Sequence, residues 1–264
     1  MVTGRGGDSG LRAELDLALA LADEADRISL AHFRTEGLVV ETKPDMTPVS
    51  QADREVEQAI RRRLERERPG HTVLGEEFGG TPAAGGFCWI VDPIDGTKRY
   101  IRGVPVFATL LALEHDGEIV VGVASAPALR RRWWAARGLG AFADGRPIGV
   151  SRVARLADAH VSLASLDSWL EQPGLFERVG AIARGAWSTT GYGDFWTHLL
   201  VAEGAADAAL EPKAAVWDVA PLKIIVEEAG GRFSDFRGAG TPSGGNGISS
   251  NGSPIHDELL ALLA

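Results

Sequence analysis

The sequence predicts an α+β protein in which a helix pair covers an antiparallel sheet and a smaller α/β half follows. Two long stretches near the N-terminus carry apolar residues at helical spacing, and strand pairs around two Asp-Gly dipeptides come after them. Beyond about residue 150, strands and helices alternate, which is typical of α/β units. We therefore expect a first region over 1–149 and a second over 150–264, which together could count as one domain.

Both helices of the first region have recognisable ends. Apolar residues recur every three or four positions from Leu11 to Phe33, and Gly37 follows the last of them. A second helix is expected to begin near Ser50 and to stop by Pro69-Gly70, because proline and glycine do not continue a helix.

The strands of the first region lie between turn residues. Strands are predicted over 72–77 and 86–92, where short apolar runs are bounded by glycine and charged residues. Two hairpins are predicted around Asp116-Gly117 and Asp144-Gly145, because Asp-Gly between apolar runs favours a two-residue turn. The helix pair would then pack on the antiparallel sheet that these strands form.

The second region alternates between helical and strand patterns. Gly230-Gly231 ends its longest apolar helix, and the glycine-rich segment 237–247 predicts a surface loop whose simplest role is a flexible connection. The expected elements are a strand over 159–167, helices near 171–184 and 194–204, a strand over 205–211, a helix over 217–229 and a terminal helix over 255–263.

Composition and charge exclude several classes of protein. The 264 residues contain no apolar run of the roughly 18 residues that a membrane span needs, and the start lacks the apolar core of a signal peptide, so we expect a cytoplasmic protein with no membrane partner. A formal charge of -9 argues against a nucleic acid partner. Cys88 is the only cysteine, which excludes a disulfide within the chain, and its apolar neighbours favour a core position.

Two carboxylates follow an apolar strand directly. Asp92 and Asp95 lie on either side of Pro93, which lacks an N–H and is expected to end the strand, and Gly96 and Thr97 come next. Two neighbouring carboxylates raise each other's pKa unless a cation lies between them. A solvated turn would also explain the motif, so these residues alone leave both interpretations open.

Further carboxylates fit the same site. Glu76 and Glu77 end the preceding strand, Asp218 begins a helix, and Asp45 and Asp53 precede or open another helix. Asp218 alone would also suit an N-cap, and Asp53 would suit a capping box. Oxygen ligands without paired histidine or cysteine favour Mg²⁺ or Mn²⁺ over zinc.

The ordered motifs GEE at 75–77, DPIDGT at 92–97 and WDVA at 217–220 resemble the inositol monophosphatase family of Mg²⁺-dependent, lithium-sensitive phosphatases. The resemblance covers nearly the whole chain, from 43 to 231. It implies a layered α-β-α-β-α sandwich of the inositol monophosphatase and fructose-1,6-bisphosphatase type. It also implies hydrolysis of a small-molecule phosphate monoester and a homodimer.

The resemblance further implies a role for individual residues. Two to three Mg²⁺ ions, or Mn²⁺ in their place, would activate a water for direct attack on the phosphate. Thr97 and Asp53 would orient that water, and Glu76 would act with them as a catalytic residue. The implied metal ligands are Glu76, Asp92, the carbonyl of Ile94, Asp95, Asp218 and, for a weaker third site, Asp45. The implied substrate contacts are Gly96, Thr97, Glu211 and Asp218.

The substrate is expected to be L-histidinol phosphate, an intermediate of histidine biosynthesis, because the segments 43–53, 91–113 and 191–218 are most similar to the histidinol-phosphate phosphatase branch of the family. Its ammonium and imidazole groups call for carboxylates, which Asp194 and Glu211 offer. Alternatives are inositol 1-phosphate, fructose 1,6-bisphosphate, a nucleotide 3′-phosphate, or a non-catalytic binding protein that keeps the fold.

Four further features bear on the pocket or on the surface. Phe195 and Trp196 could stack on an imidazole or belong to the core. Arg99 and Tyr100 stand where relatives often have Asn and Phe, and we expect them to alter the rim of the pocket. The arginine cluster at 130–132 favours a solvated strand edge over an anion or partner patch. Of the adjacent tryptophans 133 and 134, one could face a second subunit.

Overall fold

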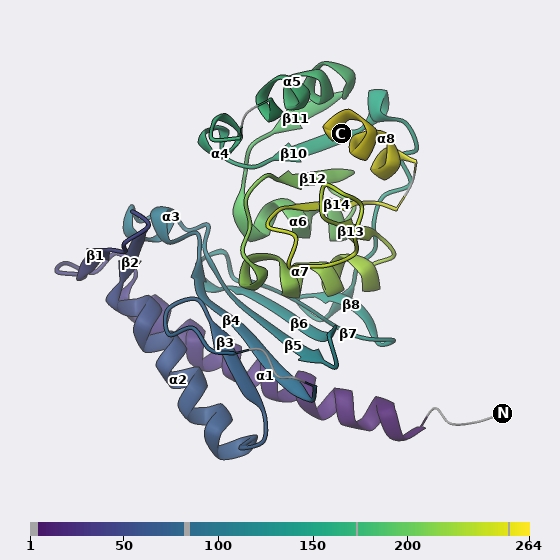
Figure 1. Cartoon of the computed structure of the whole chain (residues 1–264). Helices are drawn as coiled ribbons and strands as arrows, with labels where there is room; N and C mark the ends of the chain where they lie inside the picture. The colour runs from purple at the N-terminus through teal and green to yellow at the C-terminus, as the bar shows by residue number, and fades with distance from the viewer. Residues whose placement is uncertain (1–4, 82–84, 173, 253) are drawn as a thin grey trace. The chain divides into compact units, whose positions relative to one another are not determined.

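The computed structural model describes residues 5–81, 85–172, 174–252 and 254–264. The chain forms two compact units, unit 1 over 1–139 and unit 2 over 140–264 (Figure 1). The domain division that the sequence suggested after residue 149 stays a prediction, because compactness does not show that each unit folds alone. Within the described ranges, every helix falls short of the length or the apolar character that crossing a membrane requires.

Unit 1 combines two long helices, a small hairpin and a sheet. Its strands follow the order β3-β4-β5-β6-β7, and β1 pairs with β2 separately. The elements are α1 (Arg5–His32), β1 (Val40–Thr42), β2 (Pro48–Ser50), α2 (Gln51–Glu67), β3 (Thr72–Gly75), β4 (Phe87–Asp95), α3 (Thr97–Ile101), β5 (Ala108–His115), β6 (Glu118–Ala126), a 3₁₀ turn (Pro127–Leu129) and β7 (Arg131–Ala136).

Both predicted helices cover one face of this sheet and lie side by side (Figure 1). Their apolar stripes meet the inward side chains of β4, β5 and β6, which is the packing that their spacing predicted. The buried cluster includes Leu21, Ala25, Val56, Ile60, Trp89, Val91, Leu111 and Val123.

The sheet differs from the prediction at its first strand. The strands β4 to β7 are antiparallel, as expected, but β3 pairs with β4 in parallel. A parallel pair needs a connection that runs back along the sheet, and no local sequence pattern marks such a connection here.

Asp116 at the first predicted hairpin has a φ of 53°, and Gly117 has a φ of 83°, as a tight two-residue turn requires.

The strand β4 does not stop at Pro93, which corrects a second prediction. It continues to Asp95 through a bulge, because Asp92 pairs with Leu110 while Asp95 pairs with Ala108. Because Pro93 lies inside this bulge, its missing N–H removes no hydrogen bond between β4 and β5. The strand therefore carries both aspartates.

The arginine cluster is not a wholly solvated edge. Arg132 donates to Asp23 at 2.7 Å and to Asp26 at 2.6 Å, both on α1, and to Ser125 at 2.9 Å. The prediction of a solvated edge is wrong for Arg132, because its long side chain reaches the carboxylates of the covering helix.

Unit 2 has a mixed sheet of order β11-β10-β12-β14-β13. The strands β11, β10 and β12 are parallel, and β14 is antiparallel to β12 and β13. The elements are β8 (Gly140–Ala143), β9 (Arg146–Pro147), a 3₁₀ turn (Leu156–Asp158), β10 (His160–Leu163), α4 (Leu166–Leu170), α5 (Leu175–Gly185), β11 (Ser188–Thr190), α6 (Asp194–Ala202), β12 (Ala208–Glu211), α7 (Val216–Glu228), β13 (Arg232–Ser234), β14 (Gly247–Ser250) and α8 (Ile255–Leu263).

Helices cover both faces of this sheet (Figure 1). α5 and α8 pack against an apolar cluster that includes Val161, Leu210 and Ile248, while α6 and α7 lie on the opposite face. The second predicted hairpin is present as β8 and β9. The strand predicted over 159–167 ends at Leu163, because its ladder partners β11 and β12 also end, and α4 follows.

Candidate active site

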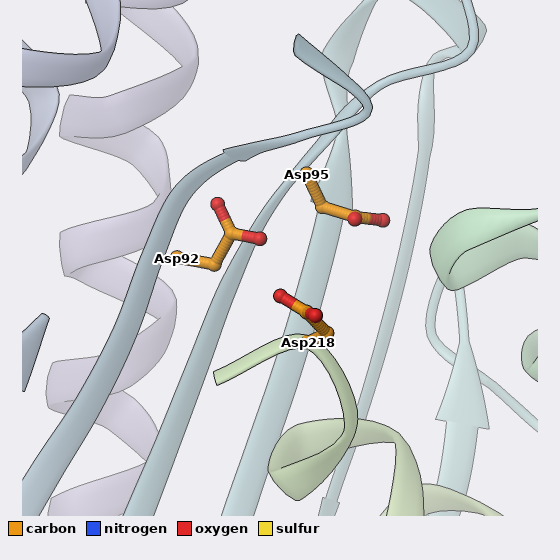
Figure 2. Close-up of side chains that lie close together, drawn as sticks. All are labelled: Asp92, Asp95 and Asp218. Atoms are coloured by element: carbon orange, nitrogen blue, oxygen red, sulfur yellow. The ribbon is translucent and has the colours of Figure 1, made fainter. Parts of the chain in front are cut away.

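The end of β4 brings two carboxylates together in unit 1. Asp92 is 2% exposed and Asp95 is 9% exposed, and one carboxylate oxygen of each lies within 4.8 Å of the other. Figure 2 labels both side chains, and also Asp218 from unit 2. The N–H of Ile94 donates to Asp92 Oδ1 at 3.0 Å, which fixes that side chain. The two aspartates belong to an acidic cluster that could hold a metal ion.

Thr97 connects this strand end to α2. Its hydroxyl donates to the carbonyl of Ile94 at 3.0 Å and lies 3.3 Å from Asp53 Oδ1. One hydroxyl proton is therefore shared between two acceptors, and the oxygen keeps lone pairs of its own. Asp53, Ile94 and Thr97 thus form a connected polar group beside the aspartates.

Asp53 takes part both in the capping box of α2 and in the polar group with Ile94 and Thr97. Its Oδ2 accepts the backbone N–H of Ser50 at 2.8 Å and the hydroxyl of the same serine, which confirms the predicted capping box. The side chain is fully buried, and burial raises the pKa of Asp53 to about 6 although the hydrogen bonds from Ser50 lower it. Its other oxygen faces Thr97.

Glu76 is held by a lysine. Lys43 Nζ donates to Glu76 Oε1 and to Glu77 Oε1, each at 2.7 Å, and the N–H of Glu76 donates to Val91 O at 3.1 Å. Burial lowers the pKa of Lys43, but the two carboxylates outweigh burial and raise it. The carboxylate of Glu76 is therefore paired with the ammonium group of Lys43.

Asp45 is bonded within its own turn. It is exposed in the turn between β1 and β2, and its Oδ1 accepts the N–H of Thr47 at 3.0 Å and the hydroxyl at 2.6 Å. These hydrogen bonds lower the pKa of Asp45. The structure shows a turn-stabilising role for this residue.

Gly96 opens the short helix α3 with a φ of 84°, a conformation that favours glycine.

Tyr100 on α3 is 1% exposed, and its hydroxyl donates to Ser29 O on α1 at 2.8 Å. The expectation that Tyr100 lies on the rim of a pocket is wrong, because its ring packs with Phe33 and Phe107.

Unit 2 carries the remaining predicted residues. Asp218 is the third residue of α7, and its Oδ2 accepts the N–H of Ala215 at 2.7 Å. Ala215 is the N-cap, so Asp218 supports the helix start from within the first turn and is not itself the cap. This arrangement repeats that of Asp53 in α2.

Asp194 and Glu211 both belong to the edge of the unit 2 sheet where the parallel strands end. Asp194 opens α6 after β11 with a φ of 52°, and Glu211 is the last residue of β12. Phe195 is 1% exposed, so of its two interpretations the core position is correct. Trp196 is partly exposed, and its ring lies 5.0 Å from that of Tyr192. Ligand sites are common at such an edge.

Comparison with known proteins decides the family. The model of the inositol monophosphatase family matches residues 11–264. The chain belongs to the inositol monophosphatase family. A histidinol-phosphatase from Mycobacterium tuberculosis is 54% identical over 255 residues, which are 95% of this chain and 97% of that protein. One from Streptomyces coelicolor is 48% identical over 259 residues, 95% of this chain and 96% of that protein.

The solved structures agree. An inositol monophosphatase from Zymomonas mobilis has a TM-score of 0.84 and 32% identity to this chain, covering 96% of this chain and 98% of that one. The predicted family and fold class are confirmed, and the chain is a phosphoric monoester hydrolase of the inositol monophosphatase family.

Two residues beside the site were not predicted. Lys43 lies in a motif that the resemblance covered, but its contacts with Glu76 and Glu77 depend on the fold. Glu57 is fully buried on α2. A charged residue on the same helix face as Val56 and Ile60 was the available signal for it.

Proposed function

We propose that the chain hydrolyses L-histidinol phosphate to L-histidinol and phosphate, with Mg²⁺ as the cofactor. The observation that carries this proposal is the identity of 54% and 48% to two histidinol-phosphatases, in each case over 95% of this chain. Identities to solved inositol monophosphatases are lower, such as the 32% to the Zymomonas mobilis protein.

The donor atoms suit a hard divalent cation. Two buried carboxylates at one strand end are costly to ionise unless a cation neutralises them, and all the donors are oxygens. When bound, Mg²⁺ would neutralise the phosphate and lower the pKa of a bound water. The proposed ligands of two ions are Asp92, Asp95, the carbonyl of Ile94, Asp218 and Glu76, with Asp45 at a third site.

The hydroxyl of Thr97 and the carboxylate of Asp53 supply a route for the proton of the attacking water. Thr97 Oγ1 accepts that proton while its own hydrogen passes to Asp53 Oδ1, 3.3 Å away. A carboxylate whose pKa is raised to about 6 by burial is ionised at neutral pH and still basic enough to take part. The backbone N–H groups of Gly96 and Thr97 would hold the phosphate.

The cationic part of the substrate is assigned to unit 2. Asp194 and Glu211 supply negative charge at the same sheet edge, and Asp218 would contact the substrate as well. The partly exposed ring of Trp196, next to Tyr192, is of the kind that stacks on an imidazole.

Phosphate release from L-histidinol phosphate tests the proposal. We expect turnover with Mg²⁺, none after treatment with EDTA, and recovery when Mg²⁺ is restored. Asp92→Asn should lower kcat/KM by about 10³-fold or more, since metal binding contributes several kcal/mol to the transition state. Circular dichroism of the variant serves as the control for folding. Release that EDTA and Asp92→Asn leave unchanged would contradict the proposed metal site.

A further inference from the structure

Unit 1 contains a buried carboxylate that the mechanism above does not use. We propose that Glu57 on α2 is a positioning residue, which holds the backbone corner carrying Glu76 in the place where that carboxylate can bind Mg²⁺. This inference rests on the proposed role of Glu76 as a metal ligand. It adds a residue that touches neither the metal nor the substrate.

Glu57 bonds to the corner directly after Glu76. Its Oε2 accepts the N–H of Glu77 at 2.8 Å, and its Oε1 lies 3.3 Å from the N–H of Phe78. The side chain is 0% exposed, and Arg61 Nε donates to Oε1 at 2.8 Å, which balances its charge. A buried carboxylate that accepts two successive backbone N–H groups of one short loop fixes the backbone of that loop.

The glycine before Glu76 leaves room for this carboxylate. A Cβ atom at Gly75 would lie 1.9 Å from Glu57 Oε1, so no larger residue fits while Glu57 keeps its place. The N–H of Gly75 donates to Gly79 O at 3.0 Å, and the guanidinium of Arg61 donates to the same carbonyl. The loop 75–79 therefore closes around the carboxylate of Glu57. Arg61 is bonded both to that carboxylate and to the loop, and Gly75 leaves the space for it.

The corner is held from a second side by β4. The N–H of Glu76 donates to Val91 O at 3.1 Å, one residue before Asp92. Asp53 lies one turn before Glu57 on α2, is also fully buried, and contacts Thr97. One helix thus positions both Thr97 and Glu76 against the strand that carries Asp92.

A purely structural role makes a different prediction. Breaking a buried ion pair by removing one partner is destabilising wherever the pair lies. If Glu57 only stabilised the fold, its loss would lower the melting temperature and leave the Mg²⁺ dependence unchanged. Residues that orient a metal ligand typically alter metal affinity by about 10–100-fold when they are replaced.

The test compares Glu57→Gln with the wild type. Glutamine keeps the shape and one acceptor oxygen but removes the charge. We expect the Mg²⁺ concentration for half-maximal phosphate release to rise by about 10–100-fold. Isothermal titration calorimetry without substrate should show the same loss of Mg²⁺ affinity, and saturating Mg²⁺ should restore most of kcat.

Asp207→Asn in unit 2 is the matched control. Asp207 is also a buried carboxylate, and it accepts the N–H of His160 at 2.7 Å. We expect this variant to melt at a lower temperature with its Mg²⁺ dependence unchanged. A Glu57→Gln protein that behaves in the same way, with lower stability and wild-type Mg²⁺ affinity, would overturn the proposal.

Gly75→Ala provides an independent check, because its methyl group must displace Glu57. We expect it to weaken Mg²⁺ binding in the wild type and to have little further effect in Glu57→Ala, where the space is free. Fully additive effects of the two substitutions would overturn the proposed coupling. If Glu76→Gln itself leaves Mg²⁺ affinity unchanged, the proposed metal role of Glu76 fails, and this inference fails with it.

Discussion

Both units bury carboxylates, such as Asp53 in unit 1 and Asp207 in unit 2, but among the described residues the buried imidazoles lie in unit 2. Unit 1 buries the carboxylates of Asp53, Glu57 and Asp92, whose charges face a strand end and the loop beside it. Unit 2 buries two imidazoles, His198 and His256, and pairs them with serine hydroxyls. Unit 1 therefore places carboxylates beside a candidate cation site. The two imidazoles of unit 2 are neutral and stabilise its fold through hydrogen bonds to serine hydroxyls.

The pKa shifts follow the same division. Burial raises the pKa of Asp53 to about 6, and burial lowers the pKa of His198 and of His256 to about 4. Mild acid should thus neutralise the carboxylate that assists catalysis in unit 1, whereas the two imidazoles of unit 2 stay neutral in the folded protein and take up a proton only on unfolding. The first change affects activity, and the second affects stability.

The largest expected effect is on the activity of unit 1. Asp53→Asn should lower kcat by about 10²–10⁴-fold, because an amide cannot take the proton from Thr97. In the wild type, kcat/KM should fall as the pH drops below about 6, where Asp53 becomes protonated. Phosphate release from pH 5 to 8 at saturating Mg²⁺ measures both effects.

The same titration should not destabilise unit 1. A carboxyl group with a raised pKa binds its proton more tightly when the protein is folded, so Asp53 adds stability as the pH falls from about 6 towards 4. If kcat/KM of Asp53→Asn falls at low pH as it does in the wild type, another group causes that fall. Asp53 would then not be part of the proton route.

A smaller effect is expected on the stability of unit 2. His256 contacts Ser234 at 2.9 Å and Ser250 at 2.8 Å, and its pKa in the folded protein lies below the ordinary 6.5. The unfolded chain therefore binds the extra proton between pH 6.5 and 4. This group should reduce the free energy of unfolding by about 2 kcal/mol between pH 7 and pH 5.

Urea unfolding at pH 7 and pH 5 measures this loss. His256→Gln keeps a polar side chain without the titration, so its stability should depend less on pH by the same amount. Equal pH dependence in the wild type and the variant would show that the buried imidazole is not the source.

Local sequence patterns predicted much of this structure. Helical spacing gave α1, α2, α7 and α8, and the Asp-Gly dipeptides gave both hairpins. Features that depend on distant partners were not predictable in this way. The parallel pairing of β3, the bulge at Pro93 and the lysine on Glu76 all arise from neighbours that the fold supplies.

The same limit applies to the candidate site. Asp92 and Asp95 were predictable because two carboxylates at the end of an apolar strand are unusual. Glu57 lies in an otherwise ordinary amphipathic helix, and its hydrogen bonds to the loop after Gly75 depend on the fold. Residues that contact the cation have a sequence signal, and residues that position them have much less.

The substrate preference tests the central claim most directly. The measurement is kcat/KM for L-histidinol phosphate and for inositol 1-phosphate, side by side in the same Mg²⁺ buffer. We predict a higher kcat/KM for L-histidinol phosphate, with the preference reduced in Asp194→Asn. A higher kcat/KM for inositol 1-phosphate would contradict the proposed function and would place the chain with the inositol-specific members of its family.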